Sequence, residues 1–180
     1  MRCLMASASS NFNCSNNNCI NYVLPVGAIT TSTQVTGPVN TPTWLQNGCN
    51  LVAMIKPNGS NPVKDIAAKV WYDGGVGVYA NKPYVARHYE LTPSVNASSS
   101  TGRVTLFFSQ QEFDDFNNYP GTHLNLPVNP ADDNGKSNLR ISKYAGTSND
   151  NTGKPGSYTN GATIIDPADE DIKWNEAMKW

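Results

Sequence analysis

Short runs in which apolar and polar residues alternate, separated by turn-forming residues, recur along most of this 180-residue chain. In residues 63–73, Ile66, Ala68 and Val70 alternate with polar neighbours, and two glycines follow. Such alternation places every second side chain on the same face of a strand. Comparable runs lie at 20–26, 49–57, 84–93, 102–109, 138–146 and 161–166. This pattern predicts an all-β fold, specifically an antiparallel Ig-like β-sandwich.

Composition supports the same fold class. Only 15% of the residues are charged, and Asn, Ser, Thr and Gly fill the spaces between the apolar runs. These residues favour turns and are poor helix formers. The Thr-, Pro- and Gly-rich stretch 31–48 is expected to be a connection with at most one short edge strand. A net charge of -1 gives no electrostatic basis for binding nucleic acid, and no run is apolar enough to span a membrane.

One short helix interrupts the strand pattern after residue 108. Ser109 and Glu112 have the spacing of a capping box, in which each side chain accepts a hydrogen bond from the other residue's backbone N–H. Phe113 and Phe116 then fall one turn apart on one face. We expect this helix to cover one side of the sandwich.

All four cysteines lie in the first third of the chain, at Cys3, Cys14, Cys19 and Cys49. They form no CxxC pair and have no histidine nearby, which argues against zinc. An even number of cysteines in an Asn-rich, Lys-poor chain predicts disulfides and an extracellular or cell-surface location. Three pairings are open; we expect Cys14 or Cys19 to pair with Cys49 and to tie an N-terminal arm, residues 1–19, to a domain of residues 20–180.

No catalytic set is evident, and we predict that the protein is not an enzyme. His88 and Glu90 share a strand with no nucleophile signature near them, so an outward face with a cross-strand charge pair is the simpler interpretation. His123 is expected to be a solvated loop residue. We predict no cofactor and no metal. Structural calcium is the alternative, through the loop carboxylates Asp132, Asp133, Asp166, Asp169 and Asp171.

Aromatic residues suggest one further kind of site. The chain has four tryptophans and eight tyrosines, most of which we expect in the core. Trp71 lies on the strand face opposite Ile66 and Val70, so it is the one expected to be exposed. An exposed Trp71 could stack against a sugar ring, which makes a carbohydrate-binding module the alternative function.

Several stretches between Cys49 and Trp180 together resemble an uncharacterised module of large secreted, adhesin-like surface proteins of Bacteroidetes. They are "CNLVAMIKPNGSNPV", "KVWYD", "YVARHYELTP", "GRVTLFFSQQEFDDFN", "GKSNLRISKYAG", "GKPGSYTNGATIIDPADEDIKWN" and the last Trp. The resemblance implies a β-sandwich, an extracellular setting linked to type IX secretion, and no catalytic residues. In that family a further apolar strand follows the position of Trp180.

The last ten residues, "DIKWNEAMKW", alternate at Ile172 and Trp174 as a half-buried strand would. If the family's last strand is absent, the sandwich keeps an open slot with unpaired backbone groups. A truncated chain, closure by the chain's own arm, and donation of a strand by another copy are the three explanations. The strand-donor candidates are Leu4, Ile20, Tyr22, Val23, Leu24 and Val26.

These observations lead to one expected function. We expect a non-enzymatic structural or adhesive module, and a surface-fibre subunit if strands are donated between copies. Its partners would then be other copies of itself, neighbouring modules of a surface protein or, for the alternative function, glycans.

Overall fold

The computed structural model describes residues 22–34 and 38–175, and for residues 32–34 only the backbone. Four antiparallel sheets make up most of the fold, which confirms the all-β prediction. The first sheet has the order β1-β4-β7, from β1 (Ile29–Gln34), β4 (Asp65–Tyr72) and β7 (Arg87–Pro93). The second has the order β2-β3-β8, from β2 (Thr43–Asn47), β3 (Asn50–Pro57) and β8 (Gly102–Leu106).

These two three-stranded sheets share the main core. Its buried side chains come from both sheets and from the turn before β4: Leu45, Val52, Ala53, Ile55, Val63, Ile66, Ala68, Val70 and Val104. In β4 the burial alternates as the sequence predicts, with Ile66, Ala68 and Val70 inside. At one edge the sheets approach each other, since the Thr31 hydroxyl donates to the carbonyl of Gln46 at 2.8 Å.

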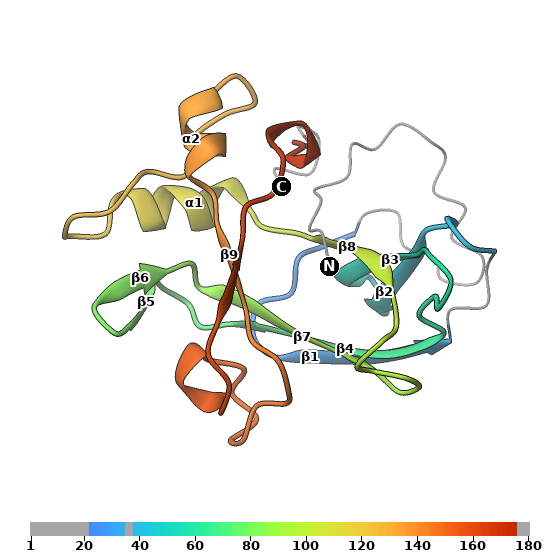
Figure 1. Ribbon diagram of the computed structural model, residues 1–180. Helices are drawn as coiled ribbons and strands as arrows, with labels where there is room; N and C mark the ends of the chain where they lie inside the picture. Colours follow the sequence, from blue (N-terminus) through green and yellow to red (C-terminus); the bar gives the residue numbers. More distant parts are fainter. Residues whose placement is uncertain (1–21, 35–37, 176–180) are drawn as a thin grey trace.

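A second group of elements lies at the other end of the molecule (Figure 1). It contains α1 (Gln110–Asn117), α2 (Asp133–Asn138), the pair β9 (Ile141–Lys143) and β10 (Thr163–Ile165), and the hairpin β5 (Gly77–Tyr79) and β6 (Lys82–Tyr84). Two 3-10 turns, η1 (Pro155–Ser157) and η2 (Asp169–Asp171), complete it. A second core here contains Phe113, Phe116, Leu126, Leu139 and Ile172.

Helix α1 confirms the capping-box prediction. The Ser109 side chain accepts from the backbone N–H of Glu112, and the Glu112 carboxylate accepts from the backbone N–H of Ser109 at 2.7 Å. Phe113 and Phe116 are both buried. Satisfying the free N–H groups lets this eight-residue helix begin sharply where β8 has ended.

Three strand predictions are wrong. In residues 22–26 only Val23 forms a β-bridge, so no first strand forms there. The stretch 31–48, expected to hold at most one edge strand, contains the end of β1 and all of β2, because threonines suit half-exposed strands. Ile172 and Trp174 are buried and partly buried as expected, but residues 172–175 form no strand. Residues 176–180 and the slot expected after Trp180 lie outside the described residues.

Candidate functional surfaces

A segment from the N-terminal part of the chain docks beside β3. The backbone N–H of Val23 donates to the carbonyl of Cys49 at 3.0 Å, and the N–H of Leu51 donates to the carbonyl of Val23 at 2.9 Å. The bridge between Val23 and Asn50 is parallel. β8 pairs with β3 only from Ala53 onward, so this segment pairs with the part of β3 that β8 does not reach.

Apolar contacts hold the same segment, residues 22–25, against the domain. The ring of Tyr22 stacks on Trp44 with centroids 6.3 Å apart, and Trp44 stacks on Phe107 at 5.9 Å. Tyr22 and Leu24 pack against buried Leu51 and Phe107. Of the other donor candidates, Val23 and Val26 are exposed, at 51% and 82%, and Leu4 and Ile20 lie outside the described residues.

A buried ion pair anchors the end of this segment. Nε of Arg87 lies 2.8 Å from Oε1 of Glu112, and both side chains are almost fully buried. The Arg87 guanidinium also donates to the carbonyl of Pro25 at 2.9 Å and lies over the ring of Tyr72. Burial raises the pKa of the Glu112 carboxyl, although Arg87 and the Ser109 N–H favour its charged form. Arg87 therefore joins the docked segment, β7 and α1.

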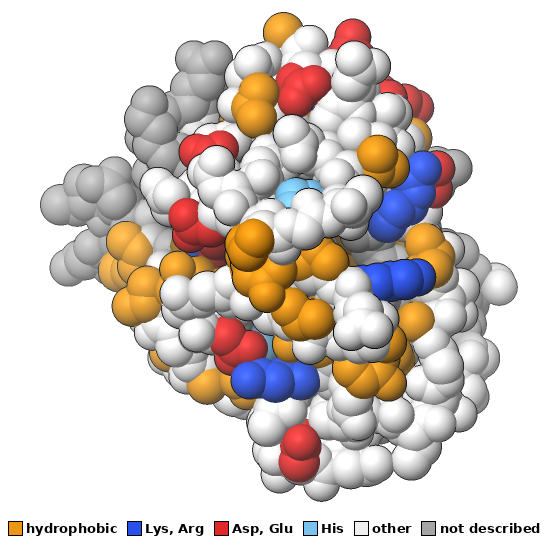
Figure 2. Space-filling view, turned by 90° about the vertical axis from the view of Figure 1, so that its left-hand side faces the viewer, with side chains coloured by type: hydrophobic (Ala, Val, Ile, Leu, Met, Phe, Trp, Pro, Cys, Tyr) orange, Lys and Arg blue, Asp and Glu red, His pale blue; other side chains and the backbone are white. Residues whose placement is uncertain are grey.

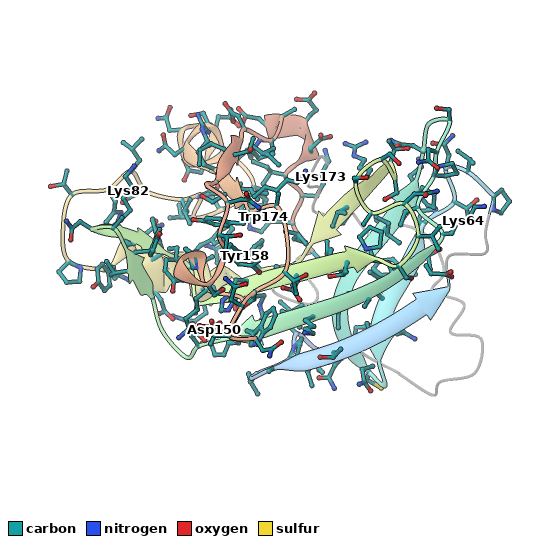
Figure 3. All side chains as sticks on the ribbon, turned by 60° about the horizontal axis from the view of Figure 1, so that its bottom comes forward. Lys64, Lys82, Asp150, Tyr158, Lys173 and Trp174 are labelled. Carbon is teal, nitrogen blue, oxygen red and sulfur yellow. The ribbon has the colours of Figure 1, made fainter. Side chains whose placement is uncertain are left out.

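A long loop covers the polar face of β4 and β7, as Figure 3 shows for Asp150 and Tyr158. The predicted cross-strand charge pair exists, with Nζ of Lys69 3.5 Å from the Glu90 carboxylate. The expected outward orientation is wrong, because Glu90 is only 6% exposed. The backbone N–H of Ser148 donates to Glu90 at 2.8 Å, and the Tyr158 hydroxyl donates to it at 3.4 Å. Glu90 thus holds the loop on the sheet.

The same loop packs on Trp71, which is partly buried and not exposed as expected, while the sugar-stacking role proposed for it stays a prediction. The Trp71 ring stacks on His88 with centroids 5.3 Å apart, and Nζ of Lys69 lies 5.9 Å from its centroid. Gly153 approaches so closely that a Cβ there would meet the Trp71 ring at 2.6 Å. Nε2 of His88 hydrogen-bonds the carbonyl of Thr152 at 2.8 Å. These contacts give Trp71 and His88 a role in loop packing.

The ionisation of Tyr158 gives a test of this packing. Burial, followed by the nearby negative charge of Glu90, raises the pKa of Tyr158 to about 12. Because folding raises this pKa, the protonated Tyr158 stabilises the folded state. This contribution is complete at pH values below the unfolded-state pKa near 10, and it is lost as the pH rises through the folded-state pKa of about 12. We expect the urea midpoint of the wild type to fall between pH 9 and pH 11.

In the matched variant Tyr158→Phe, the pH-dependent part of this fall that comes from Tyr158 should disappear. Equilibrium urea unfolding monitored by tryptophan fluorescence, at both pH values, measures the difference. Equal pH slopes for the two proteins would contradict the buried contact between Tyr158 and Glu90.

The candidate calcium ligands are engaged separately. Asp132 caps α2, and backbone N–H groups of Gly135 and Val128 lower the pKa of its carboxyl. Asp133 pairs with Lys136, Asp166 with Arg140, and Asp171 with Arg103. Asp169 begins η2. Within residues 22–34 and 38–175, no three His, Cys, Asp or Glu side chains gather as a metal site would require.

His123, expected to be solvated, is partly buried: its Nε2 hydrogen-bonds the Tyr119 carbonyl.

A group of four tyrosines, called here the tyrosine cluster, was not predicted from the sequence. It consists of Tyr79 and Tyr84 from the β5–β6 hairpin and Tyr144 and Tyr158 from the chain after β9. The rings of Tyr144 and Tyr158 stack with centroids 5.2 Å apart. Burial raises the pKa of Tyr144, and so do the neighbouring hydroxyls of Tyr79 and Tyr84. These four residues are far apart in sequence, so only the fold reveals the cluster.

Close backbone contacts position the two hairpin tyrosines. Gly77 pairs with Tyr84 across the hairpin, and a Cβ on Gly77 would meet the Tyr84 ring at 2.2 Å. Ala80 and Asn81 form the turn with φ angles of 48° and 62°, as a two-residue hairpin turn requires. Gly156, in η1, lies against Tyr79, where a Cβ would be 3.2 Å from the ring.

A shallow hollow of about 530 Å³ lies between α2 and the last described residues. Charged side chains of both signs line it: Asp133, Lys136, Asp169, Glu170 and Lys173. Pro130, Ile172 and Trp174 complete the lining. Figure 3 shows Lys173 and Trp174 on this last segment. The indole N–H of Trp174 donates to the Gln110 side chain at 3.0 Å, which fixes the segment on α1.

Cys49, beside the docked segment, is part of a disulfide. Cys3, Cys14 and Cys19 lie outside the described residues, so the expected pairing stays a prediction. No helix among the described residues is long and apolar enough to cross a membrane.

Comparisons with known proteins assign no family. A scan against protein-family models found no match, and neither the curated proteins nor the solved structures gave a significant one. Function must therefore be argued from the surfaces described above.

Proposed function

We propose that this chain is a non-enzymatic structural or adhesive module of an extracellular surface protein, with an Ig-like β-sandwich as its framework. The observation that carries the proposal is the docking of residues 22–25 beside β3, with two backbone hydrogen bonds and the contact from Arg87 to Pro25. A short segment that bonds to a sheet strand is the kind of element that fibre-forming modules exchange between copies.

Other features support the same proposal. The disulfide at Cys49 fits an oxidising compartment. Two buried carboxylates have structural partners: Glu90 bonds the 147–158 loop, and Glu112 caps α1 and pairs with Arg87. The two three-stranded sheets around one core support the sandwich framework. The resemblance to secreted surface modules of Bacteroidetes would imply the same extracellular setting.

We further propose that copies assemble by exchange of the docked segment, because contacts made within one chain can equally be made between two. We expect the full-length protein at high concentration to give heat-sensitive, high-mass species by light scattering and gel electrophoresis. Deletion of residues 1–26 should abolish them. Val23→Pro should do so too, because proline removes the N–H that donates to Cys49.

The matched control is Val26→Pro, a substitution at a side chain that is 82% exposed. It should leave the high-mass species unchanged. A full-length protein that stays strictly monomeric at every concentration tested would refute assembly by segment exchange.

A further inference from the structure

The tyrosine cluster presents partly exposed aromatic rings on one face of the molecule. Tyr79 is 47% exposed, and Tyr84, Tyr144 and Tyr158 are each partly exposed. Figure 2 shows the face on which the β5–β6 hairpin lies, with hydrophobic side chains gathered near its centre and basic side chains beside them. Aromatic rings at a surface offer flat apolar contact area that loses little conformational entropy when a ligand binds.

Hydrogen-bonding groups surround these rings. Among residues 22–34 and 38–175, the hydroxyls of Tyr79, Tyr84 and Tyr144 have no protein hydrogen-bond partner. Tyr84 also lies near an ion pair in which Nζ of Lys154 is 3.3 Å from the Asp73 carboxylate. Phenolic hydroxyls both donate and accept, while carboxylate and ammonium groups supply strong acceptors and donors. The cluster therefore combines ring faces with polar groups of both kinds.

We propose that the tyrosine cluster binds a neutral oligosaccharide. A pyranose ring has an apolar face of C–H groups, which packs on an aromatic ring, and a rim of hydroxyls, each of which donates and accepts. The half-exposed ring of Tyr79 would take the apolar face. The hydroxyls of Tyr84 and Tyr144 and the Asp73–Lys154 pair would bond the rim. This site gives the adhesive role proposed above a chemical partner, and it rests on that role for its extracellular setting.

A proline-rich peptide is the main competing ligand, because aromatic grooves also bind polyproline helices. The sugar fits better for two reasons. Tyr79 and Tyr84 lie on one face of the short β5–β6 hairpin, Gly156 lies against the Tyr79 ring, and Tyr158, two residues further on, stacks on Tyr144, so the rings form a compact group and not the row that an extended peptide would follow. The adjacent Asp73–Lys154 pair offers an acceptor and a donor side by side, which suits neighbouring sugar hydroxyls.

The experiment is a printed glycan array followed by saturation-transfer NMR with the sugars that bind, each at about 1 mM. A proline-rich decapeptide is run as the competing probe. Tyr79→Ala should weaken sugar binding about tenfold through loss of the stacking ring. Tyr79→Phe, which keeps the ring, should weaken it less. Val95→Ala removes exposed apolar surface at the turn between β7 and β8, and it should change nothing.

Thermal unfolding of each variant shows that the domain is intact, since Tyr79 is half-exposed and its truncation should leave the melting temperature nearly unchanged. The proposal is overturned if no glycan binds, if Tyr79→Ala leaves binding unchanged, or if the peptide binds at this cluster in place of sugars. Each of these results leaves the test of segment exchange at Val23 unaffected, so the two proposals fail independently.

Discussion

Arg87→Met should destabilise the folded domain by about 3–5 kcal/mol, since it leaves the Glu112 carboxylate buried without its counter-charge. Methionine retains most of the apolar stem, so the loss comes mainly from the missing charge and its hydrogen bonds. The contact to the Pro25 carbonyl is lost as well, and the docked segment should be cleaved faster by protease. Urea unfolding at pH 7 measures the first effect, and limited proteolysis the second.

The pH dependence of this variant identifies the cause. Without Arg87, the Glu112 carboxyl should have a folded-state pKa raised further above its unfolded value of 4.5. A group whose pKa is raised by folding stabilises the protein at low pH, and this contribution is lost as the pH rises through the folded-state value. Arg87→Met should therefore be more stable at pH 5 than at pH 8, relative to the wild type.

The double variant Arg87→Met/Glu112→Gln is the matched control. Glutamine keeps an oxygen that accepts from the Ser109 N–H, so the capping box of α1 survives while the buried charge is removed. We expect this protein to be more stable than Arg87→Met alone. A double variant that is less stable than the single one would show that the charge on Glu112 is not the main cost.

Phe107→Ala should cost about 3–5 kcal/mol as well, by a different mechanism. Phe107 is fully buried, stacks on Trp44, and donates its backbone N–H to the Tyr89 hydroxyl. Its truncation opens a cavity that Tyr22 and Leu24 border, so the docked segment loses packing along with the core. Equilibrium unfolding gives the free-energy change, and light scattering shows how segment exchange responds.

Two control variants set the scale for the stability loss of Phe107→Ala. Phe107→Leu fills more of the site and should lose about 1–2 kcal/mol. Leu124→Ala truncates a side chain that is 70% exposed and should fall within about 0.5 kcal/mol of the wild type. A loss for Phe107→Ala no larger than that for Leu124→Ala would mean that the aromatic stack around Phe107 contributes little.

Sequence patterns predicted α1 and the buried face of β4, because both depend on residues that are close together in the chain. The Ser109–Glu112 spacing located α1, and alternation in residues 65–72 assigned the buried face of β4. Alternation does not hold along β8, because Val104 and the next residue, Thr105, are both buried while Leu106 is only partly buried. The period of two in residues 102–109 therefore could not indicate that Phe107 is the fully buried residue there.

The candidate sites depend on partners that are far apart in the chain. Arg87 meets Glu112 and Pro25, and Glu90 meets Ser148, which is 58 residues further on. Charged residues in a strand read as an exposed face when these partners are unknown, so the burial of Arg87 and Glu90 could not be predicted. The same holds for the tyrosine cluster, whose members come from the β5–β6 hairpin and from the connection between β9 and β10.

The docking of Val23 beside β3 has a mechanical consequence. A pull on the chain before Tyr22 reaches the folded domain at the start of β3, next to the disulfide-bonded Cys49. β3 is the central strand of its sheet, flanked by β2 and β8. At Asn50 and Leu51, however, β8 does not reach β3, and the neighbours there are β2 and Val23. Tension on this segment therefore loads the two backbone hydrogen bonds of Val23 before it reaches the strands of the sheet.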